Sequence, residues 1–192
     1  MEKMEFQNII AVTNRHLCKG DFLEQIEKIC RLHPRAIILR EKDLPEVEYE
    51  KLARDVLKIT NQYGVECRLH FFWKTALKLN LSAIHLPLWK LEAMTTAEKA
   101  AFSMIGTSVH SLDEAKTAMK LGSSYLTAGH IYATDCKKGV PPRGLRFLKE
   151  ICDYADIPVY GIGGIHFDKN QIEEVIQNGA SGVCIMSGMM NL

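Results

Sequence analysis

The sequence predicts a single (β/α)₈ TIM barrel over residues 1–192, and two observations lead to this fold class. Short apolar runs alternate with helical patterns from one end of the chain to the other, and eight such runs can be recognised. These runs are apolar through most of their length, which is typical of parallel strands covered on their outer face. Eight strand–helix repeats favour a closed barrel, with an open doubly wound sheet as the alternative.

The eight strands follow the apolar runs in chain order. Each run is short, as expected of a buried strand, and is followed by a polar or glycine-containing stretch. The predicted strands are Ile9–Asn14, Ala36–Glu41, Glu66–Phe71, Ala83–Pro87, Met104–Val109, Tyr125–Ile131, Val159–Ile165 and Gly182–Met186.

Helical periodicity fills the segments between the strands, with apolar residues three and four positions apart. Ser111 is expected to cap the fifth helix with Glu114 as its capping-box partner, and a glycine in the left-handed conformation is expected to end three helices. Two helices look short, at Trp73–Leu79 and Thr95–Phe102. The apolar residues that indicate the helices are Phe22, Ile26, Ile29 and Cys30 on one face of the first helix, Leu52, Val56, Leu57 and Ile59 in the second, Ala115, Ala118, Met119 and Leu121 in the fifth, and Ile172, Val175 and Ile176 in the seventh; the ending glycines are Gly64, Gly122 and Gly179.

The spacing of the repeats is tight, because barrels of this class rarely have fewer than about 200 residues. The sequence ends at Leu192, six residues after the predicted eighth strand. We therefore expect the eighth helix to be short or absent.

Composition excludes several classes of protein. Hydrophobic residues make up 47% of the 192 residues, which excludes a disordered chain. The formal net charge is +1 and no run of lysine or arginine is present, so no nucleic-acid partner is expected. The six cysteines form no C-x-x-C pair, and Cys30, Cys67, Cys152 and Cys184 lie in apolar segments, as buried reduced thiols of a cytoplasmic protein would. No segment has the length of a membrane helix or the pattern of a signal peptide.

Functional residues of such barrels lie just after the strands, at the face called here the barrel mouth. Arg40 and Lys42 come at the end of the second strand, and residues two apart on a strand share a face. They are candidates for neutralising an anionic ligand. The alternative is a solvated surface pair, with Glu41 pointing the other way.

Glycines after the seventh and eighth strands point to a phosphate site. Gly163 and Gly164 let the backbone approach a ligand, and Ser187 follows the adjacent strand. The loops after strands seven and eight commonly cradle phosphate with backbone N–H groups in this fold. The alternative is that the glycines only make a tight turn.

The loop after the sixth strand carries the densest cluster of polar residues. His130 is the natural general acid and base, because an unperturbed imidazole titrates near pH 6.5. A histidine that is merely hydrogen-bonded at the rim is an equal alternative on the residues alone. The other members of the cluster are Thr134, Asp135, Lys137 and Lys138, and the two lysines can bind carboxylate or phosphate.

Two further histidines, His70 and His85, stand at strand ends. They are more simply interpreted as structural residues that face the mouth. A metal site built from both and His130 stays open, although the carboxylates of a hard magnesium site are missing here.

The chain resembles the thiamine phosphate synthase superfamily over essentially its whole length, and together the matching motifs are highly specific. That superfamily consists of (β/α)₈ barrels of about this length. The motifs are AVTNR (11–15), LREK (39–42), IGTSVHSLDEA (105–115), GHIYATDCKKG (129–139), GIGGI (161–165), Asn170 and GASGVCIMSG (179–188).

Thiamine phosphate synthases join a hydroxymethylpyrimidine pyrophosphate to a thiazole phosphate with magnesium, and acids after strands three and four hold the metal. This sequence departs from their pattern, with His70-Phe71 in place of Asn-Asp and 87–90 in place of the glutamine and aspartate. A phenylalanine cannot ligate magnesium. One threonine of the T-x-T-K run after strand six is also replaced, by Cys136.

The sequence is most similar to the thiazole tautomerase branch, which lacks the metal acids and shares the strand-six loop. That resemblance implies that His130 moves a proton in carboxythiazole phosphate to give the aromatic tautomer. No metal or redox cofactor is needed. It also implies that the substrate is held by Arg40, Lys42, Ser108, Thr134, Lys137, Gly163, Gly164, Met186 and Ser187.

Two other functions stay open. One is the synthase itself, a transferase, and the other is a regulatory barrel that binds a thiamine precursor without turning it over. The expected partner in each case is a small phosphorylated molecule, with neither nucleic acid nor membrane involved. A homodimer is possible.

Overall fold

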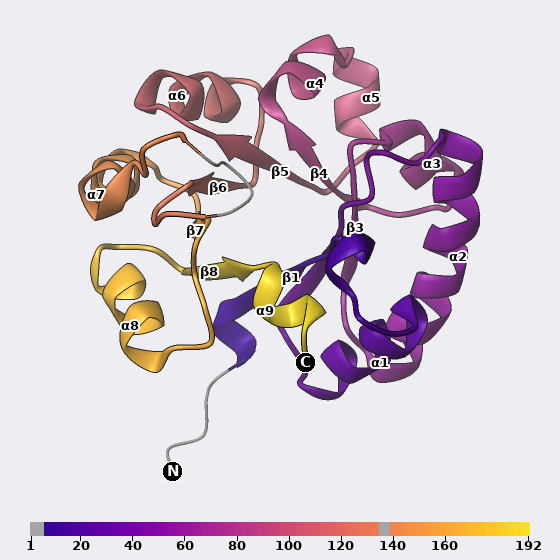
Figure 1. Cartoon of the computed structure of the whole chain (residues 1–192). Helices are drawn as coiled ribbons and strands as arrows, with labels where there is room; N and C mark the ends of the chain where they lie inside the picture. Colours follow the sequence, from indigo (N-terminus) through magenta and orange to yellow (C-terminus); the bar gives the residue numbers. More distant parts are fainter. Residues whose placement is uncertain (1–5, 135–138) are drawn as a thin grey trace. The chain divides into compact units, whose positions relative to one another are not determined.

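The computed structural model describes residues 6–134 and 139–192. Its eight parallel strands follow one another around a closed barrel in the order β1 to β8 (Figure 1). The predicted (β/α)₈ fold class is therefore confirmed. The chain divides into two compact units, one made of residues 1–85 with 185–192 and the other of residues 86–184.

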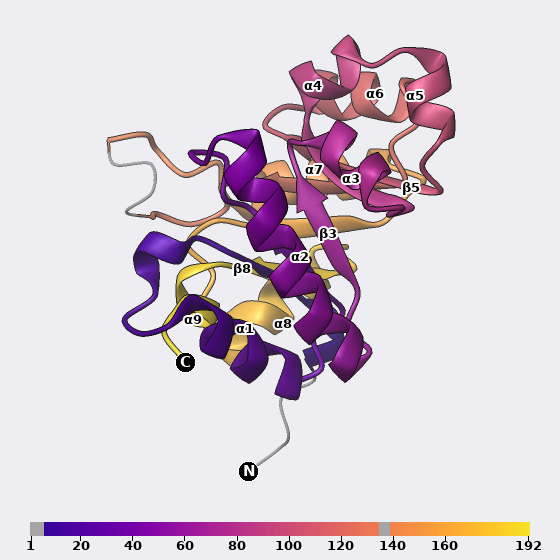
Figure 2. The same cartoon turned by 90° about the vertical axis from the view of Figure 1, so that its right-hand side faces the viewer.

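The first unit is built around the strands β1 to β3 and the start of β4. Ile10 pairs with Ala36, Ile37 with Cys67, and the ladder continues into β4. Helices α1 and α2 pack against each other, and α2 also contacts β3 (Figure 2). The elements are η1 (Phe6–Asn8), β1 (Ile9–Val12), η2 (Arg15–Leu17), α1 (Phe22–Arg31), β2 (Ala36–Leu39), α2 (Glu46–Tyr63), β3 (Cys67–His70), α3 (Trp73–Lys78), β4 (Ala83–Pro87) and, near the C-terminus, α9 (Ser187–Met190).

The second unit is built around β5, β6 and β7. The ladder pairs Thr107 with Leu126 and Ala128 with Gly161, and it extends from β7 to β8. Helix α6 packs on β5, and α7 packs on both β6 and β7. The elements are α4 (Leu88–Ala93), α5 (Thr96–Ala100), β5 (Met104–Val109), α6 (Leu112–Lys120), β6 (Tyr125–Gly129), α7 (Gly144–Tyr154), β7 (Val159–Ile162), α8 (Lys169–Gln177) and β8 (Gly182–Ile185).

Helix ends follow the local signals in the sequence. Ser111 caps α6 by accepting a hydrogen bond from the Glu114 N–H, as predicted. The Glu114 carboxylate, however, accepts from the N–H of His110 rather than from that of Ser111, so the predicted capping box is only half formed. Gly64 ends α2 in the left-handed conformation, with a φ of 65°, as expected.

The buried face of α2 includes two residues with hydroxyl groups, and of the four apolar residues that indicated this helix only Val56 is fully buried. The residues that face the core are Tyr49, Ala53, Val56 and Thr60, whereas Leu52, Leu57 and Ile59 are only half-buried. Burial of the two hydroxyls costs little because both are bonded: Tyr49 donates to the Leu39 carbonyl at 2.7 Å and Thr60 to the Leu57 carbonyl at 3.3 Å.

The remaining differences concern element lengths. Six strands end earlier or start later than predicted, because the residues at their ends turn into loops, while β4 and β5 have the predicted bounds. Helix α4 was not predicted. The eighth helix is present as the four-residue α9, and the buried side chain of Gln25 in α1 donates to the carbonyl of Met189 in it at 2.6 Å.

The cysteines are mostly buried as expected. Cys30, Cys67 and Cys184 are buried, and burial raises the pKa of Cys30 to about 11 and that of Cys67 to about 12. Cys152 is only half-buried, which corrects its expected place in the core. In residues 6–134 and 139–192, no helix combines the length and apolar character needed to cross a bilayer.

Candidate active site

In the first unit, the ends of β1 and β2 are tied together by a buried carboxylate. Glu41 is 1% exposed and accepts hydrogen bonds from the Thr13 hydroxyl at 2.6 Å and from the backbone N–H and Nη1 of Arg15 at 3.1 Å. Arg15 also forms a forked ion pair with Asp43, which holds the pKa of Asp43 well below its usual range. The guanidinium of Arg15 is therefore occupied by two carboxylates of the chain.

Arg40 follows β2 and is positioned by the same network. Its backbone N–H donates to the Thr13 hydroxyl at 2.9 Å, so Thr13 links the Glu41 carboxylate to the backbone of Arg40. The Arg40 side chain is half-buried and Lys42 is exposed. Within residues 6–134 and 139–192, neither side-chain cation has a hydrogen-bond or ion-pair partner. Both are thus available to an anion.

His70, at the end of β3, and His85, in the middle of β4, lie side by side. They are paired in the strand register, and their rings stack with centroids 5.9 Å apart and an interplanar angle of 23°. Burial, helped by the charges of Arg40 and Lys42, lowers the pKa of His70 to about 3. Burial also holds the pKa of His85 well below its usual value, helped by His70, Arg68 and Arg40. Both imidazoles are therefore neutral near pH 7.

In the second unit, His130 directly follows β6 and is 4% exposed. Its Nε2 lies 3.3 Å from the carbonyl oxygen of Val140, and its own carbonyl accepts from the Arg143 N–H at 2.9 Å. These contacts with Val140 and Arg143 leave the side chain buried rather than exposed to solvent. Its Nδ1 is buried without a hydrogen-bond partner among the described residues.

Gly163 and Gly164 pack directly against the segment that carries His130. A Cβ atom on Gly163 would lie 2.3 Å from Cβ of His130, and one on Gly164 would lie 2.4 Å from the Ala133 carbonyl oxygen. Both glycines also have a positive φ, of 101° and 68°. Close packing between the two loops thus requires glycine at both positions, whether or not a phosphate binds.

The other predicted substrate-binding residues of the second unit are spread over two loops and a strand. Ser108 lies on β5 and accepts a hydrogen bond from Thr127 of β6 at 3.1 Å, and Thr134 is half-buried. Lys137 lies outside the described residues, as do Asp135 and Lys138. In the first unit, Met186 and Ser187 stand at the start of α9, with Met186 half-buried and Ser187 exposed.

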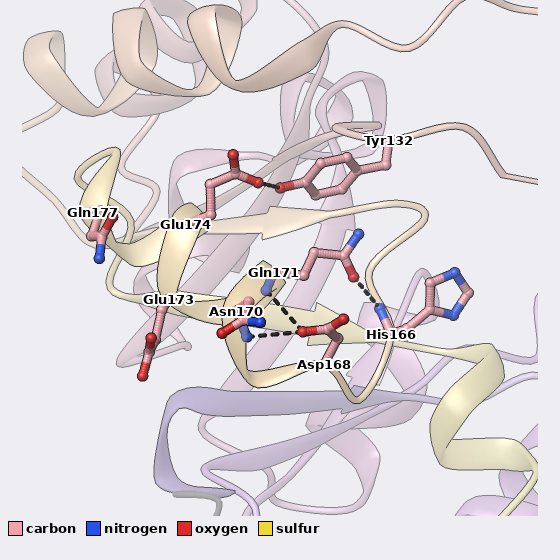
Figure 3. Close-up of a pocket in the computed structure, with 8 residues that line it drawn as sticks. All are labelled: Tyr132, His166, Asp168, Asn170, Gln171, Glu173, Glu174 and Gln177. Atoms are coloured by element: carbon pink, nitrogen blue, oxygen red, sulfur yellow. Dashed lines mark hydrogen bonds between the residues drawn. The ribbon is translucent and has the colours of Figure 1, made fainter.

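A surface pocket of about 630 Å³ lies beside α8 in the second unit, and the sequence did not predict it (Figure 3). Its carboxylates already have partners within the unit. Glu174 accepts from the Tyr132 hydroxyl at 2.7 Å, and Asp168 caps α8 by accepting from the Asn170 N–H. Gln171 bonds to the Gly164 carbonyl at 3.1 Å. The residues of this pocket therefore hold the loop after β7 in place. The pocket is lined by acidic side chains, which disfavour a phosphate.

A family model and the curated relatives point to the same family. The family model described as thiamine monophosphate synthase matches residues 9–189. The chain belongs to the thiamine monophosphate synthase family.

Relatives of this family resemble the chain over most of its length. A protein of Aquifex aeolicus whose name provisionally assigns it as thiamine-phosphate synthase 2 is 34% identical, over 96% of this chain and 98% of its own length. The thiamine-phosphate synthase of Pyrococcus horikoshii is also 34% identical, over 81% of this chain and 74% of its own. The solved thiamine phosphate pyrophosphorylase of Pyrococcus furiosus superposes with a TM-score of 0.80 at 26% identity, covering 97% of this chain and 88% of its own.

The segment at the end of β3 is held in place by two aromatic residues. Phe71 follows His70 with a φ of 75°, and its ring lies 6.3 Å from that of His70. The Tyr49 hydroxyl accepts from the His70 N–H at 3.0 Å while it donates to β2. No periodic pattern of the sequence predicts this arrangement. The available hints were a tyrosine on a helix and one histidine in each of two short strands.

Proposed function

We propose that this member of the thiamine monophosphate synthase family is a thiazole tautomerase, which isomerises carboxythiazole phosphate to its aromatic tautomer. His130 would serve as the acid and base catalyst. The observation that carries the proposal is which nitrogen of its imidazole has a hydrogen-bond partner and which has none. Because a carbonyl oxygen can only accept, the contact with Val140 places a proton on Nε2, and in the neutral imidazole the lone pair is then on Nδ1. That lone pair has no partner among the described residues and can take a proton from a substrate.

The residues after β3 and β4 support an isomerase over a metal-dependent transferase. His70 and Phe71 supply no carboxylate, and the end of β4 continues as Pro87, Leu88 and Trp89, which also supply none. Magnesium needs hard oxygen ligands, and a pyrophosphate needs the metal to leave. A proton transfer that ends in an aromatic ring needs only one acid–base group and anion-binding residues.

The anionic groups of the substrate would be held by the residues named from the sequence. Arg40 and Lys42 provide cations without partners in residues 6–134 and 139–192. The N–H groups of Gly163 and Gly164 donate no hydrogen bond to the described residues, which leaves them available to phosphate oxygens. Ser108, Thr134, Lys137, Met186 and Ser187 stay proposed substrate contacts.

The test is the proton transfer itself. The protein is incubated with the product of a thiazole synthase, and the ratio of the two tautomers is followed by NMR. We expect His130→Asn to lower kcat by roughly 10²- to 10⁴-fold while KM changes little, since other groups bind the anions. His166→Asn is the matched control, because that histidine is exposed and, among the described residues, its side chain forms no hydrogen bond while its backbone N–H donates to Gln171. Unchanged turnover in His130→Asn would remove the proposal.

A second candidate is the transferase, because the relatives carry the name thiamine-phosphate synthase. It predicts magnesium-dependent coupling of hydroxymethylpyrimidine pyrophosphate to thiazole phosphate. Coupling that disappears with a chelator, together with no effect on the tautomer ratio, would decide for this candidate.

A further inference from the structure

The stacked histidines of the first unit have properties that the tautomerase reaction does not explain. They occupy the region where a family synthase would hold metal, yet they are neutral and neighbour two cations. The groups concerned are His70, His85, Arg40 and Lys42, with Phe71 on the outer side of the stack.

These groups lie in a row across three strands. Leu39 pairs with Leu69 in the ladder, so Arg40 and His70, one residue further along each strand, are neighbours. His70 in turn pairs with His85. The Tyr49 hydroxyl bridges the Leu39 carbonyl and the His70 N–H, which fixes β2 and β3 relative to each other at this point.

The chemistry of this row favours an anion and disfavours a metal ion. His70 is 7% exposed, and its Nδ1 is buried without a hydrogen-bond partner among the described residues. A buried polar atom without a partner destabilises the ligand-free protein. Two cations close by repel a divalent metal, while a neutral imidazole can place its N–H on Nδ1 and donate it to an anion.

A planar carboxylate fits this arrangement better than a phosphate. The guanidinium of Arg40 can bind one carboxylate with two parallel hydrogen bonds. The rings of Phe71, His70 and His85 are stacked in this order, with successive centroids 6.3 and 5.9 Å apart. His70 and His85 are buried while Phe71 is only half-buried, so Phe71 is the ring of the three that can contact an aromatic ring carrying the carboxylate.

We propose that Arg40, Lys42 and the His70–His85 stack form a metal-free subsite that recognises the carboxylate of an aromatic heterocyclic acid. The proposal rests on the proposed function in that carboxythiazole phosphate is such an acid. It assigns to His70 a direct hydrogen bond to the ligand, and to His85 a positioning role through ring stacking.

The test uses thiazole-2-carboxylate as the probe and its neutral isostere, thiazole-2-carboxamide, as the comparison ligand. His70→Phe keeps a ring of similar size in the stack but removes the N–H donor. We expect it to weaken binding of the carboxylate about 10- to 100-fold and to leave the carboxamide and inorganic phosphate unaffected, since a hydrogen bond to a charged group is lost only with the first probe. His33→Asn removes an exposed histidine of the same unit and should change none of the three affinities.

A second measurement keeps the proposal testable if His70→Phe does not fold. In wild-type protein labelled with ¹⁵N in its histidines, thiazole-2-carboxylate should shift the Nδ1 resonance of His70, and the carboxamide should not. Equal weakening of phosphate and carboxylate in the variant, or no shift in the wild type, would overturn the subsite. The proposed function is tested by the turnover of His130→Asn, and the subsite is tested by the binding of thiazole-2-carboxylate. Either result can be negative without the other, so the two proposals fail separately.

Discussion

The buried neutral histidine His70 predicts how the stability of the protein depends on pH. Its pKa is about 3 in the folded chain, against an ordinary value of 6.5. Between those two values the unfolded chain binds a proton that the folded chain does not, so stability falls as the pH decreases from 6.5 towards 3. At pH 5, about 1.5 units below the ordinary pKa, protonation of this histidine stabilises the unfolded chain by about 2 kcal/mol relative to the folded chain.

The perturbation is His70→Phe, and the assay is urea unfolding at pH 7.5 and pH 5. Between these pH values, the free energy of unfolding of the wild type should drop by about 2 kcal/mol more than that of the variant. Carboxylates and His85 titrate in both proteins, so their contributions largely cancel in the difference. At pH 7.5 the variant should be as stable as the wild type or more so, because the partnerless Nδ1 is gone. The same drop in both proteins would refute the reasoning that His70 is buried in its neutral form.

Two further predictions concern the framework of the barrel. Glu41→Gln should lower the free energy of unfolding by about 2–4 kcal/mol, because the buried carboxylate loses its charge and part of its hydrogen bonding, whereas the exposed Asp55→Asn should cost less than about 1 kcal/mol. If Glu41→Gln lowers the free energy of unfolding by less than Asp55→Asn does, the hydrogen bonds of Glu41 do not stabilise the fold. Gly106→Ala should lower the melting temperature, since its Cβ would lie 2.0 Å from the ring of Tyr125, and steric conflicts of this kind cost about 1–3 kcal/mol. Gly20→Ala meets no atom within 4 Å and should leave the melting temperature unchanged, so equal effects would contradict the packing argument.

The sequence predicted strand positions well, because apolar runs report burial directly. It indicated the helix α2 but not which of its faces is buried, since the apolar residues Leu52, Leu57 and Ile59 lie outside the buried face. Tyr49 and Thr60 can face the core only because their hydroxyls find backbone carbonyls, and hydrophobicity alone does not reveal such partners.

For the candidate site, the sequence placed His130 at the end of β6 but did not predict its burial. The cover comes from the contact of Val140 with the imidazole, which is loop packing without any periodic pattern. In the same way, the order of Arg40, His70 and His85 across three strands depends on the register of the ladder, which no local motif specifies.

The backbone at residue 71 has a consequence for how metal binding could be engineered into this barrel. A φ of 75° is costly for a bulky residue such as Phe71, while asparagine and aspartate adopt this region far more readily. The resemblance to the synthases places an aspartate at this same position. Phe71→Asp would therefore need no change in backbone conformation, and a path from this site to a magnesium-binding one runs through side-chain replacements alone.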